Sequence, residues 1–131
     1  MNVLLSIKPR YVEEILQGNK RFEFRKSYFK QDVEKVFIYS SHPSKEIVGF
    51  FTVGKVHIDT PERVWGKCGK HGSISRAEFF SYFSGKEMAV GIEIDDLEIF
   101  EDSIKPHDIF PEFVPPQSYY YLNHQLEQLL Y

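Results

Sequence analysis

Residues 18–25 read Gly-Asn-Lys-Arg-Phe-Glu-Phe-Arg, and this stretch decides how the chain is interpreted. Gly18 suits the left-handed residue that ends a short helix, and the alternation of Phe with charged residues after it predicts a strand. The two phenylalanines must face a core, so the backbone that carries Lys20, Glu23 and Arg25 is held in place. Polar groups fixed on a strand lose little further entropy when they meet a ligand. The stretch therefore predicts a binding site at which chemistry is possible.

Strict alternation along this strand divides the charged side chains between two faces. It places Arg21, Glu23 and Arg25 together on one face. Lys20 falls on the other face, beside the phenylalanines. Lys20 can join the cluster only if the strand begins after it, or if the turn at Gly18 reorients it.

Each of these charged residues also has a purely structural interpretation. Lys20 can be an exposed lysine after a helix end, or a phosphate ligand or base with a pKa lowered by burial. Glu23 can form an ion pair with Arg25 or Arg21, or it can accept hydrogen bonds from a base edge or act as a general base. Arg25 suits a bidentate phosphate contact and equally a structural clamp on the carboxylate.

Composition predicts one ordinary globular domain over residues 1–131, with 42% hydrophobic and 27% charged residues. Cys68 is the single cysteine, which excludes an internal disulfide and fits a reducing compartment. The first residues form neither a signal peptide nor a membrane span. We therefore expect a soluble, cytoplasmic protein that does not associate with membranes.

Charge is distributed unevenly along the chain, although the net charge is only −3. Residues 1–30 contain seven cations and three anions, whereas residues 101–131 contain one lysine and five acidic residues. A local basic surface can attract a phosphate-bearing ligand despite an acidic total. The alternative is that these charges are solvated and never cluster.

Hydrophobic patterning predicts short strands with short helices between them. Pro9, Thr60-Pro61 and Ser75 mark helix starts, and 122–130 has the pattern of a final helix. No sequence typical of a Rossmann or Walker nucleotide site is present. The pattern predicts an α+β fold, a small mixed β-barrel of five or six strands with short flanking helices. The expected strands lie at 3–7, 20–26, 36–40, 47–58, 88–94 and 97–100.

Two runs closely resemble the ASCH domain of the PUA-like superfamily: Ser-Ile-Lys-Pro-Arg-Tyr at 6–11 and Ile-Leu-x-Gly-x-Lys-x-x-Glu-Phe-Arg-Lys at 15–26. Shorter pieces fit in order: Val-Phe-Ile-Tyr-Ser-Ser at 36–41, Ile-Val-Gly at 47–49, Val-Trp at 64–65, Phe-Phe-x-Tyr-Phe at 79–83 and Pro-Pro-Gln-Ser-Tyr at 115–119. The resemblance covers nearly the whole chain. It implies a PUA-like β-barrel with a ligand cleft beside the motif.

The resemblance also implies a function in binding RNA or modified nucleotides, with a possible regulatory part in RNA metabolism or transcription. One branch of the family deacylates acetylcytidine, using the motif lysine, a threonine three positions later and a distant glutamate. Lys20 matches the lysine, but Glu23 stands where the threonine would be. Glu78 lies where the distant glutamate is expected, yet it also completes a capping box with Ser75. The missing threonine favours binding over hydrolysis.

The sequence thus leads to a set of expected site residues and partners. If the protein is an enzyme, a small amidohydrolase acting on a modified nucleoside, Lys20 with Glu23 or Glu78 supplies the acid and base. A protein-interaction domain with a vestigial cleft is a third alternative. We expect no metal and no cofactor; the partner is RNA, another nucleic acid or a modified nucleoside, and the oligomeric state is left open. The expected ligand-binding residues are Ser6, Lys8, Lys20, Arg21, Glu23, Arg25 and Lys26.

Overall fold

A computed structural model describes residues 1–130 and contains one six-stranded sheet in the order β2-β5-β4-β3-β1-β6. The strands are β1 (Val3–Ile7), β2 (Phe22–Arg25), β3 (Lys35–Ser40), β4 (Glu46–Asp59), β5 (Ala89–Ile104) and β6 (Tyr119–Tyr121). The helices are α1 (Pro9–Leu16), α2 (Pro61–Cys68), α3 (Arg76–Tyr82), α4 (Pro106–Ile109) and α5 (His124–Leu130), with a 3-10 turn, η1, at Gly69–His71.

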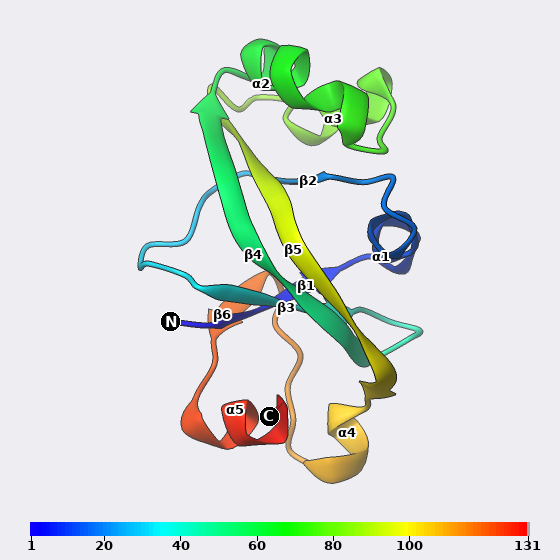
Figure 1. Cartoon of the computed structure of the whole chain (residues 1–131). Helices are drawn as coiled ribbons and strands as arrows, with labels where there is room; N and C mark the ends of the chain where they lie inside the picture. The colour runs from blue at the N-terminus through cyan, green and yellow to red at the C-terminus, as the bar shows by residue number, and fades with distance from the viewer. Residues whose placement is uncertain (131) are drawn as a thin grey trace.

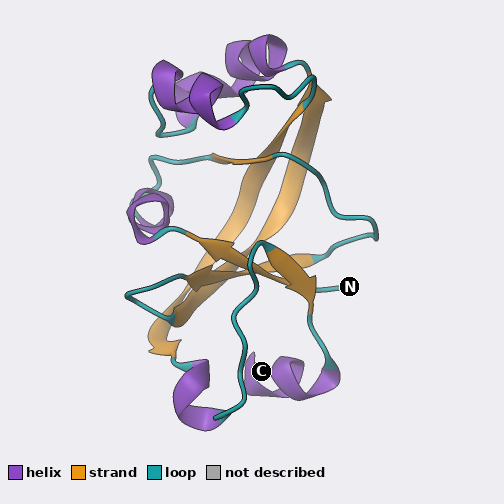
Figure 2. Ribbon diagram, turned by 180° about the vertical axis from the view of Figure 1, so that it is seen from behind, coloured by secondary structure: helices purple, strands orange, loops and turns teal. Residues whose placement is uncertain are grey.

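The sheet is mixed and curls into a half-barrel, which confirms the predicted α+β class. β1 runs parallel to β3, and the other neighbouring strands are antiparallel. β4 and β5 form a long diagonal ribbon with α2 and α3 at one end and α4 at the other (Figure 1). Seen from behind, α2 and α3 lie at one end of the molecule, and α4 and α5 lie at the other (Figure 2).

The β4–β5 ribbon is interrupted by β-bulges. Its register shifts between Ile47 and Gly49 and again farther along the strand. The prediction of two separate strands at 88–94 and 97–100 was wrong, because β5 is continuous. At Asp96, with φ 44°, the strand contains a bulge: the register with β4 shifts between Phe50 and Thr52, and aspartate tolerates this left-handed conformation.

Two elements near the C-terminus were not predicted. β6 pairs antiparallel with β1, and it follows a proline-rich segment that hides any strand pattern. α4 is a single turn that begins at Pro106. β2 is also shorter than expected, because it begins at Phe22 rather than at Lys20.

The core consists of three clusters of buried side chains. The largest lies between the sheet and α1, and includes Leu5, Ile15 and Phe51. A second joins the sheet to the segment leading into α5, and a third packs Phe24 and Phe79 beneath α2 and α3. The third cluster fixes the position of α3 relative to β2. No helix in residues 1–130 is both long and apolar enough to span a membrane.

Candidate functional site

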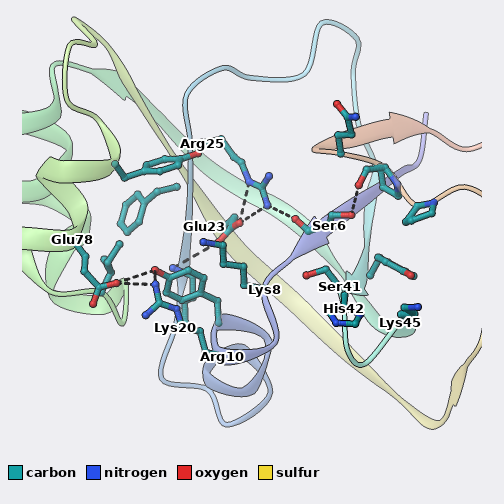
Figure 3. Close-up of a pocket in the computed structure, with 18 of the residues that line it drawn as sticks. Ser6, Lys8, Arg10, Lys20, Glu23, Arg25, Ser41, His42, Lys45 and Glu78 are labelled. Atoms are coloured by element: carbon teal, nitrogen blue, oxygen red, sulfur yellow. Dashed lines mark hydrogen bonds and ion pairs between the residues drawn. The ribbon is translucent and has the colours of Figure 1, made fainter.

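One cleft of about 940 Å³ contains most of the expected site residues. Its walls come from the β1–α1 junction, β2, the turn between β3 and β4, α3, α4 and the segment 115–117 (Figure 3). Such a volume is near the upper end of small-ligand sites, which span roughly 300–1,000 Å³. The charged and histidine residues that line it are Lys8, Arg10, Lys20, Glu23, Arg25, His42, Lys45, Glu78 and His107.

Lys20 reaches this cleft because the chain turns sharply between α1 and β2. Gly18 has φ 82°, which glycine adopts without strain. The amides of Asn19 and Lys20 then both donate to the carbonyl of Glu14, each at 3.0 Å. Lys20 therefore precedes the strand and escapes its alternation, so the turn places it beside Glu23.

The Lys20 side chain is almost fully buried, with 3% of the residue exposed. Its Nζ donates to the carbonyl of Gly72 at 2.6 Å and lies 3.7 Å from Glu23 Oε1. The rings of Tyr11 and Phe24 are each 4.9 Å from the ammonium. Burial lowers the pKa of Lys20 below its usual 10.5, although the charge of Glu23 opposes the shift. The interpretation of Lys20 as an exposed lysine is wrong.

Glu23 and Arg25 form the ion pair that was one interpretation of the motif. Arg25 donates to Glu23 Oε2 from Nε at 3.0 Å and from Nη2 at 2.7 Å. The same Nη2 donates to the carbonyl of Ser6 at 2.7 Å, and Ser6 Oγ donates to the carbonyl of Pro116 at 2.6 Å. Figure 3 shows Arg25 lying between Glu23 and Ser6. The motif thus ties β2, β1 and the segment before β6 into one wall of the cleft.

Ser75 caps α3, but Glu78 completes only half of the expected capping box, because its side chain lines the cleft. Its amide donates to Ser75 Oγ at 3.1 Å, which is the N-cap bond that the sequence predicted. The carboxylate turns away from Ser75 and pairs with Arg10 at 2.8 Å, with the Tyr11 hydroxyl at 3.5 Å. This contact joins α3 to α1 across the mouth of the cleft, in front of the buried Lys20.

Lys8 and Lys45 are the cleft cations without an internal partner. Within the described 130 residues, neither ammonium makes an ion pair or a hydrogen bond, whereas Arg10, Lys20 and Arg25 each face a carboxylate. Lys8 lies just before α1, and Lys45 lies in the turn between β3 and β4. The cleft therefore contains five cations against two carboxylates, and two of the cations are free to meet an anion.

The structure does not bring every expected residue into the cleft. Ser6, Lys8, Lys20, Glu23, Arg25 and Glu78 line it, but Arg21 and Lys26 do not. The backbone of Arg21 bonds to His71 and Ile94, while the Lys26 ammonium lies 4.6 Å from the centre of the Tyr82 ring. The part that each of these residues plays in ligand binding stays a prediction.

One wall of the cleft was not anticipated from the sequence. Tyr39, at the end of β3, hydrogen-bonds to His107 Nε2 of α4 at 2.9 Å. His42 and Lys45 follow in the next turn and lie across the cleft from Glu78 (Figure 3). His42 and His107 are far apart in the sequence, so no local spacing could reveal that both line one cleft. Nowhere in residues 1–130 do three His, Cys, Asp or Glu side chains come together as metal ligands would.

Comparison with known proteins gives a consistent family and fold. The model of the ASCH domain family matches residues 5–98. An ASCH domain-containing ribonuclease of Zymomonas mobilis is 26% identical over 132 residues, covering 97% of this chain and 88% of the relative. A crystal structure of ASCH from Zymomonas mobilis superposes with a TM-score of 0.88 at 25% identity, covering 98% of this chain and 92% of that one. A structure of a mutant form of that protein superposes equally well, at 24% identity.

A second kind of relative matches over a shorter length. The large ribosomal subunit protein uL22 of Ureaplasma parvum is 28% identical over 88 residues. The match covers 66% of this chain but only 28% of that protein. The shared part is therefore a segment of a much longer chain.

Proposed function

This chain belongs to the ASCH domain family, and from that premise we propose that its cleft binds RNA, with backbone phosphates held by Lys8 and Lys45. The observation that carries the proposal is the pair of free cations in a cleft with excess positive charge. Buried or paired cations have little left to offer a phosphate, whereas an unpaired lysine can form a charge-assisted hydrogen bond with it. The ribonuclease relative, aligned over 97% of this chain, supports RNA as the polymer.

Cleavage of the bound RNA is the second part of the proposal, and the histidine wall supports it. Phosphodiester cleavage through the ribose needs a base to take the 2′-hydroxyl proton as that oxygen attacks phosphorus. It also needs an acid to protonate the departing 5′-oxygen. Histidine exchanges protons near neutral pH, and His42 and His107 line the same cleft as Lys45. We assign the two histidines as the candidate acid–base groups.

Deacylation of a modified nucleoside remains the alternative, and the lowered pKa of Lys20 is the observation that favours it. A neutral lysine can take a proton, and Glu23 lies beside it. Against it, Lys20 already donates to Gly72 at 2.6 Å, and no threonine hydroxyl stands in the motif. We therefore rank deacylation below RNA binding and cleavage.

Fluorescence anisotropy with a labelled RNA oligonucleotide tests the binding proposal. Lys8→Gln and Lys45→Gln each remove one charge from the cleft, and Lys55→Gln removes an exposed charge from β4 outside it. We expect each cleft variant to weaken binding by about 1–3 kcal/mol, as for other hydrogen bonds to charged groups. The control should bind like the wild type. Equal binding by all four proteins would contradict the proposed site.

Two activity assays separate the catalytic alternatives. Gel analysis of the oligonucleotide should show cleavage by the wild type, and His42→Ala and His107→Ala should slow it while binding persists. Hydrolysis of acetylcytidine by the wild type, lost in Lys20→Arg, would instead support deacylation, since arginine cannot give up its proton near neutral pH.

A further inference from the structure

Helix α3 and its C-cap bury Phe79 and Phe83, leave Phe80 half-buried and turn Tyr82 outward. Phe79 and Phe83 are 0% and 2% exposed, respectively, whereas Tyr82 is 40% exposed and lines the cleft. An isolated exposed aromatic is unremarkable on a protein surface. Tyr82 differs because its exposed surface lies within a charged cleft.

The Tyr82 ring is held in position by its neighbours. The Lys26 ammonium lies 4.6 Å from the ring centre, and the Phe83 ring packs at 4.8 Å with an interplanar angle of 74°. Tyr82 lines the same cleft as the Glu23–Arg25 ion pair, and burial raises the pKa of its hydroxyl. A ring fixed before the ligand arrives costs little further ordering when it makes a contact.

We propose that an unpaired nucleobase of the bound RNA stacks on the face of the Tyr82 ring opposite Lys26, with Lys26 contacting a neighbouring phosphate. This inference rests on the proposed function, RNA binding in the cleft, and adds a recognition site for the base to the phosphate contacts of Lys8 and Lys45. Stacking on an aromatic ring accepts any base, since every base has a π-face, and an adjacent cation strengthens it. A base within a duplex already has neighbours on both faces, so the platform selects an unpaired nucleotide.

This proposal gives Lys26 a part in ligand binding although it does not line the cavity. Lys26 is exposed, and its ammonium lies over a ring that does line the cleft. A base stacked on Tyr82 brings its phosphate to this edge of the cleft, where an exposed lysine meets it. Lys26 thus extends the charged surface beyond the cavity itself.

Variants at Tyr82 test the platform by anisotropy with a short single-stranded RNA. Tyr82→Phe keeps the ring and should bind within about twofold of the wild type. Tyr82→Leu keeps an apolar side chain but loses the ring, and should weaken binding by about 5- to 150-fold, which corresponds to 1–3 kcal/mol per stacked base. Lys26→Gln should make the fall of log affinity with log salt less steep by about 0.7. Circular dichroism establishes that each variant is folded.

A series of oligonucleotides, each with one abasic residue, shows whether a base is the partner. For the wild type, one abasic position should cost as much affinity as Tyr82→Leu does, and that position should cost the Leu variant nothing further. Equal losses in both proteins, or wild-type affinity in Tyr82→Leu, would overturn the platform while RNA binding that depends on Lys8 and Lys45 stands. Failure of the wild type to bind RNA would overturn both proposals.

Discussion

Lys20 is a buried cation whose protonation must affect the stability of the fold. Its pKa lies below 10.5 in the folded protein because burial disfavours the charged form, despite the attraction of Glu23. Between the lowered pKa and 10.5 the unfolded chain binds more protons at this position than the folded chain. Stability from Lys20 therefore rises as pH increases through this window, and below it the burial penalty applies in full.

We expect Lys20→Met to remove this dependence. The free energy of unfolding of the wild type, minus that of the variant, should increase as pH rises toward 10.5. Urea denaturation followed by circular dichroism across the alkaline range measures it. Tyr11 and Tyr82 have raised pKa values, which shift stability the other way, but both proteins contain them and the difference cancels most of that contribution. A difference that stays flat or falls with pH would contradict the assignment.

Glu23 neutralises two cations at once, so its loss should be costly. Glu23→Gln leaves Lys20 and Arg25 without a counter-charge, and breaking a buried pair costs about 3–5 kcal/mol of unfolding free energy. We expect the lower end, because the Arg25 side chain is 16% exposed at the cleft. The matched control is Glu78→Gln, which removes an equally direct Arg ion pair whose side chains are 59% and 48% exposed. Such exposed pairs contribute about 0–1 kcal/mol, so similar losses in both variants would refute the argument.

For single residues, the sequence predicts ion pairs within one strand more readily than it predicts which charged side chains are left unpaired. The Glu23–Arg25 pair follows from i,i+2 spacing on one strand face and needs no tertiary information. The direction of Lys20 depends on a turn after Gly18, so alternation alone placed it wrongly. That Lys8 and Lys45 have no partner within residues 1–130 depends on where the carboxylates lie in the fold, which the linear sequence does not contain.

The pairing of β4 with β5 depends on a glycine that lets the two backbones approach closely. A Cβ added at Gly49 would lie 2.1 Å from the carbonyl oxygen of Glu98, a backbone atom that cannot yield without moving β5. In contrast, a Cβ at Gly66 in α2 would meet nothing within 4 Å. The two glycines therefore have opposite roles, although both lie inside regular elements.

We expect Gly49→Ala and Gly66→Ala to change stability in opposite directions. Gly49→Ala should lower the free energy of unfolding by about 1–3 kcal/mol, as overpacking does. Gly66→Ala should raise it by about 0.5–1 kcal/mol, because alanine loses less entropy than glycine in a helix. Chemical denaturation of the two variants beside the wild type measures both. Destabilisation by Gly66→Ala would show that the helix needs glycine for another reason.

The elements that could be predicted are those with local signals. Thr60 and Ser75 cap α2 and α3 as expected, each accepting a bond from the amide three residues later. β1 agrees with its predicted bounds, Val3–Ile7, because five residues rich in apolar side chains suit a fully buried strand. β6 has no such signal: its pairing with β1 brings together residues more than 100 positions apart. The break expected between 94 and 97 is present only as a bulge, because β5 pairs with β4 on both sides of Asp96 and continues as one strand.

For the whole molecule, the cleft gathers charge from segments that are distant in the sequence. The N-terminal excess of cations contributes Lys8, Arg10, Lys20 and Arg25, whereas the expected Arg21 and Lys26 do not line it. Lys45 and His107 come from elsewhere, and the latter lies in the acidic C-terminal region. A charge count along the chain therefore indicated the N-terminal cations of the cleft but missed Lys45 and His107. Only the curl of the half-barrel brings these two residues opposite the N-terminal cations.

Because Lys8 and Lys45 lie on different walls of the cleft, we expect RNA binding to depend on the salt concentration through both lysines. If phosphates bridge the cleft, RNA binding releases counterions, and log affinity falls linearly with log salt by about 0.7 per phosphate contact on a single strand. Lys8→Gln/Lys45→Gln should then reduce the steepness of this slope by about 1.4, twice that contribution, while Lys55→Gln leaves it unchanged. Anisotropy titrations over a range of potassium chloride concentrations measure the slopes. Weaker binding with an unchanged slope would mean that the two lysines support the fold of the cleft without touching phosphate, and the proposed site would have to move.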